Sequence, residues 1–280
     1  MKIGMVLEGG AMRGMYTAGI IDMLLEDEIK VDTIVGVSAG VLFGVNYLSK
    51  QKGRIIRYNK EYAKDPRYMG FRSLITTGNI INKEFAFYEV PFKLDIFDEE
   101  EFEKSDCELY ATVTNVETGK PEYFKVNNVY SDMELLRATS AMPFVSKIVE
   151  LDGKKYLDGG ISDSIPVDKC KELGCNKIIV VLTRPLEYRK KKANSFMTKI
   201  GYSKYPNLIN TINNRYKNYN DILEKVIESE GKNEIFVLRP SKDLHIKRIE
   251  KDKEKLQAMY DLGIEDYREN IEELRKYLYG

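Results

Sequence analysis

The segment Gly36-Val37-Ser38-Ala39-Gly40 contains the residue types that point most directly to chemistry. Its pattern, G-x-S-x-G, follows a short apolar run and precedes a stretch with helical spacing. A serine on so sharp a strand-to-helix turn needs small neighbours, and its hydroxyl stands above the sheet at a helix N-terminus. The segment therefore predicts Ser38 as a nucleophile, with Gly36 and Gly40 shaping the turn.

A glycine loop, Gly9-Gly10-Ala11-Met12-Arg13-Gly14, is the second signal, and it also follows an apolar run. Backbone N–H groups exposed in such a loop bind negative charge, which suits an oxyanion hole for acyl transfer. A dinucleotide-binding G-x-G-x-x-G loop is the rival interpretation. Ala11 at its third position disfavours it, as does a second strand that ends at the serine turn instead of at an acidic residue. A plain tight turn is the third alternative.

The base that would activate the serine is the third question. The single histidine, His245, lies late in the chain beside charged residues, which is typical of a surface position. Asp158-Gly159-Gly160 ends a short apolar run and offers a carboxylate instead, although alone it resembles an ordinary hairpin or loop. With one histidine and no C-x-x-C pair, we predict no metal site and no cofactor.

These residues need elements that hold them together. Apolar strands at 2–7 and 33–37, each followed by a helix (16–26 and 41–48), predict a mostly parallel sheet covered by helices. We expect helices and loops over 50–103. The other expected strands are 108–115, 122–126, 177–182, 235–238 and a hairpin of 144–150 with 154–157. The other expected helices are 131–140, opened by a capping box of Ser131 and Glu134, then 166–173, parts of 189–231, and 244–279.

Composition narrows the class of protein. The 280 residues are 43% hydrophobic, enough for one sizeable core, and 44 basic residues balance 44 acidic ones. A net charge of zero gives no general attraction to nucleic acid, which we do not expect as a partner. Three cysteines that cannot all pair suggest a reducing compartment. No apolar run approaches the roughly 20 residues that span a bilayer. We expect a cytoplasmic protein without a cleaved signal.

Taken together, the three motifs resemble those of the bacterial patatin-like phospholipases. The order Gly9-Gly10-x-x-Arg13-Gly14, Gly36-x-Ser38-x-Gly40 and Asp158-Gly159-Gly160 is similar to that family. So are the smaller pieces 111–115, 117–119 and 138–143. The resemblance covers residues 1–185, and the one departure is Ala11, where the family often has a third glycine.

The resemblance implies a three-layer α/β/α fold with a mostly parallel central sheet and a helical C-terminal extension. Residues 1–185 would form the catalytic domain. Residues 186–280 would add a helical insert, the last strand and the C-terminal helices, packed on the same core.

The resemblance also implies a two-residue dyad without histidine, in which Asp158 takes the proton of Ser38. The loop residues Gly9, Gly10, Ala11, Met12, Arg13 and Gly14 would bind the oxyanion or substrate, with Gly159 and Gly160 supporting the aspartate. Arg13 would orient the loop or meet a phosphate headgroup. Because a free aspartate has a pKa of ~3.9, the site must raise that pKa or stabilise the oxyanion strongly.

The predicted function is a serine acyl hydrolase of the phospholipase A, lysophospholipase or esterase type. An acyltransferase using the same acyl-enzyme and a non-catalytic lipid-binding protein are the alternatives. The predicted partner is a lipid ester. The basic run Arg189, Lys190, Lys191 and Lys192 would contact the anionic headgroups of a membrane surface, or form a solvated face. The same prediction extends to the basic residues that follow among tyrosines: Lys199, Lys204, Arg215 and Lys217. Phe71, Phe85, Phe87, Tyr88 and Phe92 are read as core residues or as a cover for an acyl pocket. Headgroup, acyl length and oligomeric state stay open.

Overall fold

One eight-stranded sheet organises the chain in the computed structural model, which describes residues 1–192 and 196–280. The strand order is β5-β6-β3-β2-β1-β7-β8, and β4 pairs with β3 outside this path. The strands are β1 (Ile3–Leu7), β2 (Thr33–Val37), β3 (Glu108–Asn115), β4 (Pro121–Val126), β5 (Val149–Leu151), β6 (Lys154–Asp158), β7 (Lys177–Val181) and β8 (Phe236–Leu238).

The centre of the sheet is parallel. β1 lies between β2 and β7, while β3 and β8 extend the parallel region on either side. Among the strands that the structure describes, β4, β5 and β6 make the antiparallel pairings. Every residue of β1 and β2 is buried, as expected for strands covered on both faces. The predicted mostly parallel α/β sheet is therefore confirmed.

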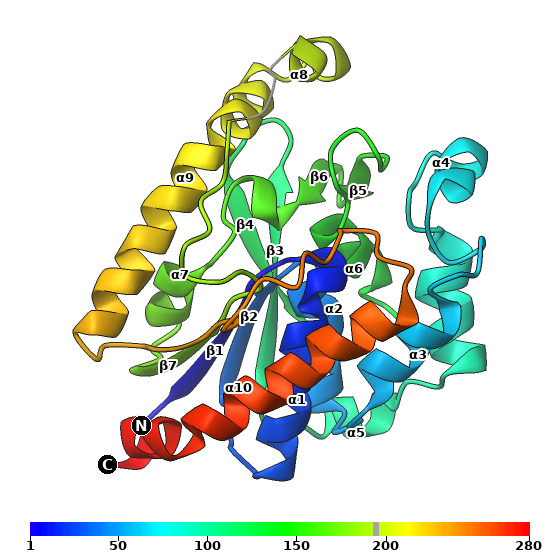
Figure 1. The fold of residues 1–280 in the computed structure, drawn as a ribbon. Coiled ribbons are helices and arrows are strands. Elements are labelled where there is room, and N and C mark those ends of the chain that lie inside the picture. The colour runs from blue at the N-terminus through cyan, green and yellow to red at the C-terminus, as the bar shows by residue number, and fades with distance from the viewer. Residues whose placement is uncertain (193–195) are drawn as a thin grey trace.

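Helices cover both faces of this sheet (Figure 1). One face packs against α7 and α9 in a cluster that includes Val6, Val180 and Leu223. The larger core lies on the other face, beneath helices that include α1, α2 and α10. The α-helices are α1 (Met15–Glu26), α2 (Ala39–Leu48), α3 (Arg54–Tyr62), α4 (Phe71–Thr77), α5 (Glu99–Glu103), α6 (Met133–Thr139), α7 (Val167–Glu172), α8 (Phe196–Gly201), α9 (Pro206–Gly231) and α10 (Lys253–Tyr279). The short 3-10 helices η1 (Ala11–Gly14) and η3 (Gly159–Ile161) and the π-helix η2 (Lys83–Leu94) complete the set.

Three local predictions are wrong. Helix α6 begins at Met133 without a capping box, because its N-cap Asp132 instead accepts hydrogen bonds from the N–H groups of Asn127 and Asn128. The strand predicted at 144–150 starts only at Val149. The C-terminal helix starts at Lys253, nine residues late, because the preceding segment crosses over the glycine loop, where the Met12 N–H donates to the Arg248 carbonyl at 3.2 Å.

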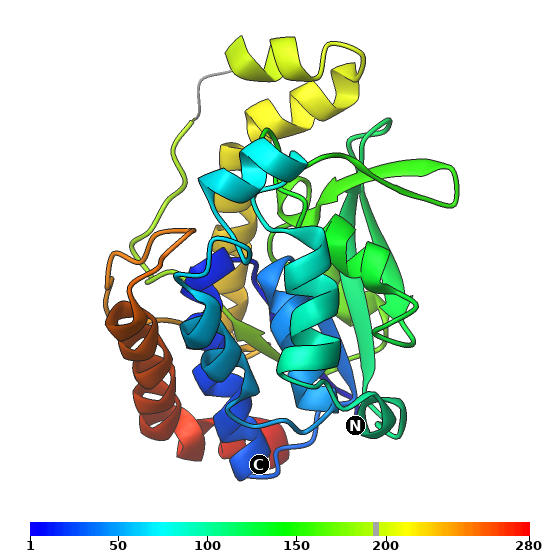
Figure 2. The ribbon, with the colours of Figure 1, turned by 90° about the vertical axis from the view of Figure 1, so that its right-hand side faces the viewer.

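Helix α10 lies along α1, and Figures 1 and 2 show the two side by side. Two glycines make this close approach possible. A Cβ atom on Gly19 would collide with the Tyr260 carbonyl oxygen, and one on Gly263 would collide with the Tyr16 carbonyl oxygen. Backbone therefore meets backbone at this crossing, which fixes α10 against the helix that follows the glycine loop. Among the described residues, no helix is both long enough and apolar enough to cross a bilayer.

Replacing Gly19 with leucine tests this contact. The new side chain would improve helix propensity by up to about 1 kcal/mol, but it meets backbone that cannot yield. We expect a net loss of about 3 kcal/mol in the free energy of unfolding, measured by urea denaturation. Gly231→Ala is the control, because nothing lies within 4 Å of a Cβ atom at that position. An unchanged urea midpoint for Gly19→Leu would contradict this packing.

Candidate active site

Ser38 occupies a strained turn between β2 and α2. Its backbone angles, φ 54° and ψ −124°, lie where side chains are rarely tolerated. Both neighbouring glycines are needed for space. A Cβ atom on Gly36 would lie 2.9 Å from the Val41 nitrogen, and one on Gly40 would collide with the Leu7 carbonyl oxygen. The predicted strand-turn-helix context of the serine is therefore present.

A threonine from another element fixes this turn. The Ser38 N–H donates to the Thr139 hydroxyl oxygen at 2.9 Å, and that hydroxyl donates to the Thr112 carbonyl at 2.7 Å. Thr139 ends α6 and is fully buried, and Thr112 lies in β3. The hydroxyl thus ties the serine turn to the neighbouring strand through two hydrogen bonds inside the core.

Strand register brings Asp158 to the same place. Val37 of β2 pairs with Thr112 of β3, and Asp158 of β6 pairs with Val113 on the other side of β3. Ser38 and Asp158 therefore stand at strand ends that flank β3, and both side chains line one cavity. They are 8% and 6% exposed. Gly159 allows the approach, because a Cβ atom there would collide with the Thr112 carbonyl oxygen.

The environment of Asp158 changes its basicity. Burial raises the pKa of Asp158 above its ordinary value, because a charged carboxylate loses its water there. Four influences oppose that shift of the pKa. In order of size they are the positive charge of Arg215, the N–H of Gly160, a hydrogen bond from the Ser38 hydroxyl and the positive charge of Arg248. The Gly160 N–H donates to the Asp158 carboxylate at 2.7 Å. The net rise in pKa makes Asp158 a better proton acceptor than a free aspartate.

The glycine loop lies against the serine. A Cβ atom on Gly9 would lie 3.0 Å from the Ser38 Cβ. The Met12 N–H donates to the Arg248 carbonyl, and the Arg13 N–H donates to the Gly10 carbonyl, both at 3.2 Å. Within the described part of the chain, the N–H groups of Gly9, Gly10 and Ala11 have no hydrogen-bond partner. These three N–H groups are therefore available to donate hydrogen bonds to an anion.

Ala11 adopts a positive φ of 48°, which glycine adopts without strain. The departure from the resembled motif thus falls on the loop residue whose backbone favours glycine. Gly14, the last motif glycine, packs against Phe43, whose ring a Cβ atom would approach to 2.7 Å.

Two cavities meet beside Ser38. The first, called here the polar cavity, has a volume of about 410 Å³, and its lining includes Ser38, Asp158, Arg13, Lys190 and Arg215. The second, called the apolar cavity, has a volume of about 120 Å³, and its lining includes Leu42, Phe43, Phe87, Met133 and Leu136. Ala11, Met142 and Arg248 line both cavities, so they mark the junction.

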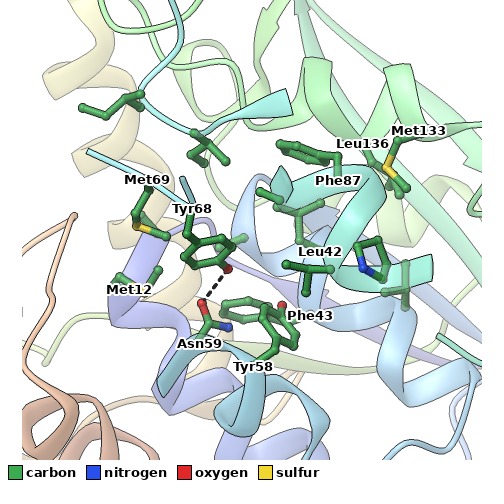
Figure 3. Close-up of a pocket in the computed structure, with 18 of the residues that line it drawn as sticks. Met12, Leu42, Phe43, Tyr58, Asn59, Tyr68, Met69, Phe87, Met133 and Leu136 are labelled. Carbon is green, nitrogen blue, oxygen red and sulfur yellow. Dashed lines mark hydrogen bonds between the residues drawn. The ribbon is translucent and has the colours of Figure 1, made fainter. Parts of the chain in front are cut away.

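The apolar cavity lies between α2, α3, η2 and α6 (Figure 3). Leu42, Phe43, Phe87 and Leu136 gather around the same space in that view. Two of its polar groups pair with each other, since the Tyr68 hydroxyl donates to the Asn59 side-chain oxygen at 3.0 Å. Of the predicted aromatic cover residues, only Phe87 lines this cavity. Phe85 packs against Tyr62 and Tyr68, and Phe71 is 74% exposed.

Several residues at the site escaped the sequence analysis. Glu8 is buried at the end of β1 and accepts hydrogen bonds from Thr183 and Tyr219. Arg215, on α9, donates to the Gly160 carbonyl. The sequence analysis placed Arg215 among basic residues expected to contact headgroups, but it did not predict this position beside Asp158. The one histidine, His245, is 87% exposed and lines neither cavity.

The four residues of the basic run, 189–192, lie in different surroundings. Arg189 pairs with Glu224, while the Lys190 ammonium group lies 4.0 Å from the centre of the Tyr219 ring. Lys190 and Lys191 line the polar cavity, and Lys192 is exposed.

Comparison with known proteins agrees with this architecture. Residues 5–170 match the family model of the patatin-like phospholipases, and residues 205–279 match a domain of unknown function, DUF6363. An uncharacterised Escherichia coli protein, YjjU, is 28% identical over 87% of this chain and 70% of its own length. Lysophospholipase nte1 of Aspergillus fumigatus is 30% identical over 64% of this chain, which spans only 12% of that relative.

Two further similarities are more distant. A probable lipid hydrolase, 463L, of invertebrate iridescent virus 6 is 28% identical over 59% of this chain and 61% of its own length. The solved structure of VipD from Legionella pneumophila matches with a TM-score of 0.41 and 12% identity, covering 96% of this chain and 67% of that one. Because the family model spans more than half of the 280 residues, the chain belongs to the patatin-like phospholipase family.

Proposed function

We propose that this protein is a serine acyl hydrolase that cleaves acyl esters of lipids through a dyad of Ser38 and Asp158. The supporting observation is that a strained serine and a buried carboxylate, distant in sequence, line one cavity across strand β3. The names of the relatives, a lysophospholipase and a probable lipid hydrolase, favour the same substrate class.

The proposed reaction has two stages. Asp158 accepts the hydroxyl proton as the Ser38 oxygen attacks the ester carbonyl, and the N–H groups of Gly10 and Ala11 stabilise the oxyanion. The proton then passes to the departing alcohol, which leaves an acyl-enzyme. A water molecule gives a proton to Asp158 and attacks the acyl carbon, the fatty acid is released, and the proton returns to Ser38.

The apolar cavity is the proposed place for the acyl chain. It begins beside the serine, because Ala39 follows Ser38 and lines it, and apolar side chains dominate its wall. Burial of a chain there is favoured by about 0.8 kcal/mol per CH₂ group. This pocket supports a lipid ester over a small polar ester as the substrate.

Hydrolysis is preferred to acyl transfer for a specific reason. A serine–histidine mechanism would have to use His245, and the position of that residue outside both cavities gives it no part in the site. An intact nucleophile and base also argue against a purely lipid-binding role.

Peripheral contact with a membrane surface stays part of this proposal. Lys190 and Lys191 line the polar cavity. We therefore propose that these residues of the basic run contact lipid at the cavity and not on an open flat face. The exposed Phe71 and Ile75, one turn apart on α4, are further candidates for contact with lipid.

Removing either dyad member tests the proposed reaction. Ser38→Ala and Asp158→Asn should each lower kcat for a lysophospholipid by roughly 10⁴-fold or more, because each removes a group that acts on the reacting atoms. Ser140→Ala is the matched control, since that serine hydrogen-bonds backbone carbonyls of α6 and lines neither cavity. Near-normal turnover by a folded Ser38→Ala or Asp158→Asn variant would contradict the proposed dyad.

The pKa of Asp158 predicts a pH dependence. Asp158 must be unprotonated to act as base, so kcat/KM should fall as pH drops through its raised pKa, above the ~3.9 of a free aspartate. Arg215→Gln removes the largest influence that lowers this pKa, and the acid limb should move to higher pH. Arg215→Lys keeps the charge and should leave the limb near that of the wild type. Profiles measured with a neutral short-chain ester that coincide for all three proteins would contradict this role of Arg215.

A further inference from the structure

The polar cavity carries an excess of positive charge that the proposed dyad does not use. Six cationic side chains line it: Arg13, Arg184, Lys190, Lys191, Arg215 and Arg248. Among the described residues, two carboxylates line the cavity, Glu8 and Asp158, and a third, Asp243, lies near Arg184. Such an imbalance in a partly enclosed space is costly unless an anion occupies it.

Four separate parts of the chain supply these cations. Arg13 comes from η1, Arg184 and Lys190 from the segment after β7, Arg215 from α9, and Arg248 from the segment before α10. Aromatic faces hold two of them. The Arg184 guanidinium lies 4.5 Å from the Tyr188 ring centre, and the Lys190 ammonium lies 4.0 Å from that of Tyr219. Packing therefore holds Arg184 and Lys190 at the cavity, whereas Lys191 and Arg248 are exposed.

The two carboxylates are already engaged. Glu8 accepts hydrogen bonds from the Thr183 N–H, the Thr183 hydroxyl and the Tyr219 hydroxyl. Asp158 accepts the Gly160 N–H and lies beside Ser38. Neither carboxylate forms an ion pair within 4 Å with these cations in the described part of the chain.

The cations themselves keep unused donors. The Nε atoms of Arg13 and Arg184 are buried and have no hydrogen-bond partner among the described residues. Arg184 has one carboxylate nearby, Asp243, at 3.6 Å. Burial and, after it, the charge of Arg215 lower the pKa of Lys190 to about 7. An anion in the cavity would offset the repulsion between these cations and would accept hydrogen bonds from the unpaired Nε–H groups of Arg13 and Arg184.

We propose that the polar cavity binds the phosphate group of the lipid, so that the substrate is an acyl lipid with a net anionic, phosphate-bearing headgroup. This inference rests on the proposed acyl hydrolysis. The two cavities meet at Ala11, Met142 and Arg248, so the acyl chain and the phosphate lie on opposite sides of the ester at Ser38. A choline or ethanolamine headgroup would bring a further cation among six, and we expect such lipids to be poorer ligands.

The binding test uses amphiphiles that contain no ester. Titration calorimetry on the full chain, below the critical micelle concentration, compares dodecyl phosphate, dodecylphosphocholine and inorganic phosphate. Dodecyl phosphate should bind at least about tenfold more tightly than either of the others. Equal affinity for dodecylphosphocholine would overturn the charge argument, and equal affinity for inorganic phosphate would assign the cavity to free phosphate instead of a lipid.

Variants assign that affinity to the cavity. Lys190→Gln and Arg184→Gln, singly and together, should weaken dodecyl phosphate binding by about tenfold or more in the double variant. Each substitution removes one of several repelling charges, so folding should survive, and thermal unfolding checks this. Lys192→Gln is the control, because that lysine is exposed and lies outside both cavities. Unchanged affinity in the folded double variant would refute the site.

Turnover separates this inference from the function on which it rests. The wild type should show a kcat/KM at least about tenfold higher for lysophosphatidic acid than for a monoacylglycerol with the same chain. Equal values for the two esters would overturn the headgroup inference and leave acyl hydrolysis standing. Tight binding of dodecyl phosphate without hydrolysis of any ester would refute the hydrolase proposal but would still support the phosphate site.

Discussion

The hydrogen bond from the Ser38 N–H to the Thr139 hydroxyl is the interaction on which the site depends. A non-glycine residue at φ 54° persists only where its surroundings hold it there. Thr139 does so from α6 and passes the constraint to the Thr112 carbonyl of β3, the strand that separates Ser38 from Asp158. One buried hydroxyl thus links the turn of Ser38, the proposed nucleophile, to the strand register that brings in Asp158, the proposed base.

Burial and positive charge act against each other at Asp158. Burial alone would favour the neutral acid, which could not take a proton from serine. Arg215, Gly160 and Ser38 each favour the charged carboxylate. They therefore limit the rise in the pKa of Asp158, so that its carboxylate can still accept a proton. Arg215 lies on α9 and so outside the segment that matches the patatin-like model, within the part that matches DUF6363. The C-terminal region therefore reaches into the site, and the division at residue 185 stays a prediction.

Local sequence signals predicted the parts of the site that local sterics govern. Gly36, Gly40 and Gly159 could be read because each stands where backbone or a packed side chain leaves no room for a Cβ atom. Thr139, Glu8 and Arg215 reach the site through contacts distant in sequence, which no local pattern reports. The capping box failed because the side chains that would form it have other partners. Glu134 pairs with Lys83 and Arg137, and the carboxylate of Asp132 is used by the loop before the helix.

The most direct test of the central claim asks whether Ser38 is an activated nucleophile. The purified protein would be treated with a fluorophosphonate probe, which reacts with activated serines without a choice of lipid, and the labelled peptide would be mapped by mass spectrometry. This account predicts labelling at Ser38 in the wild type and none at that position in Ser38→Ala. Labelling at another serine such as Ser140, or none in the folded wild type, would contradict it.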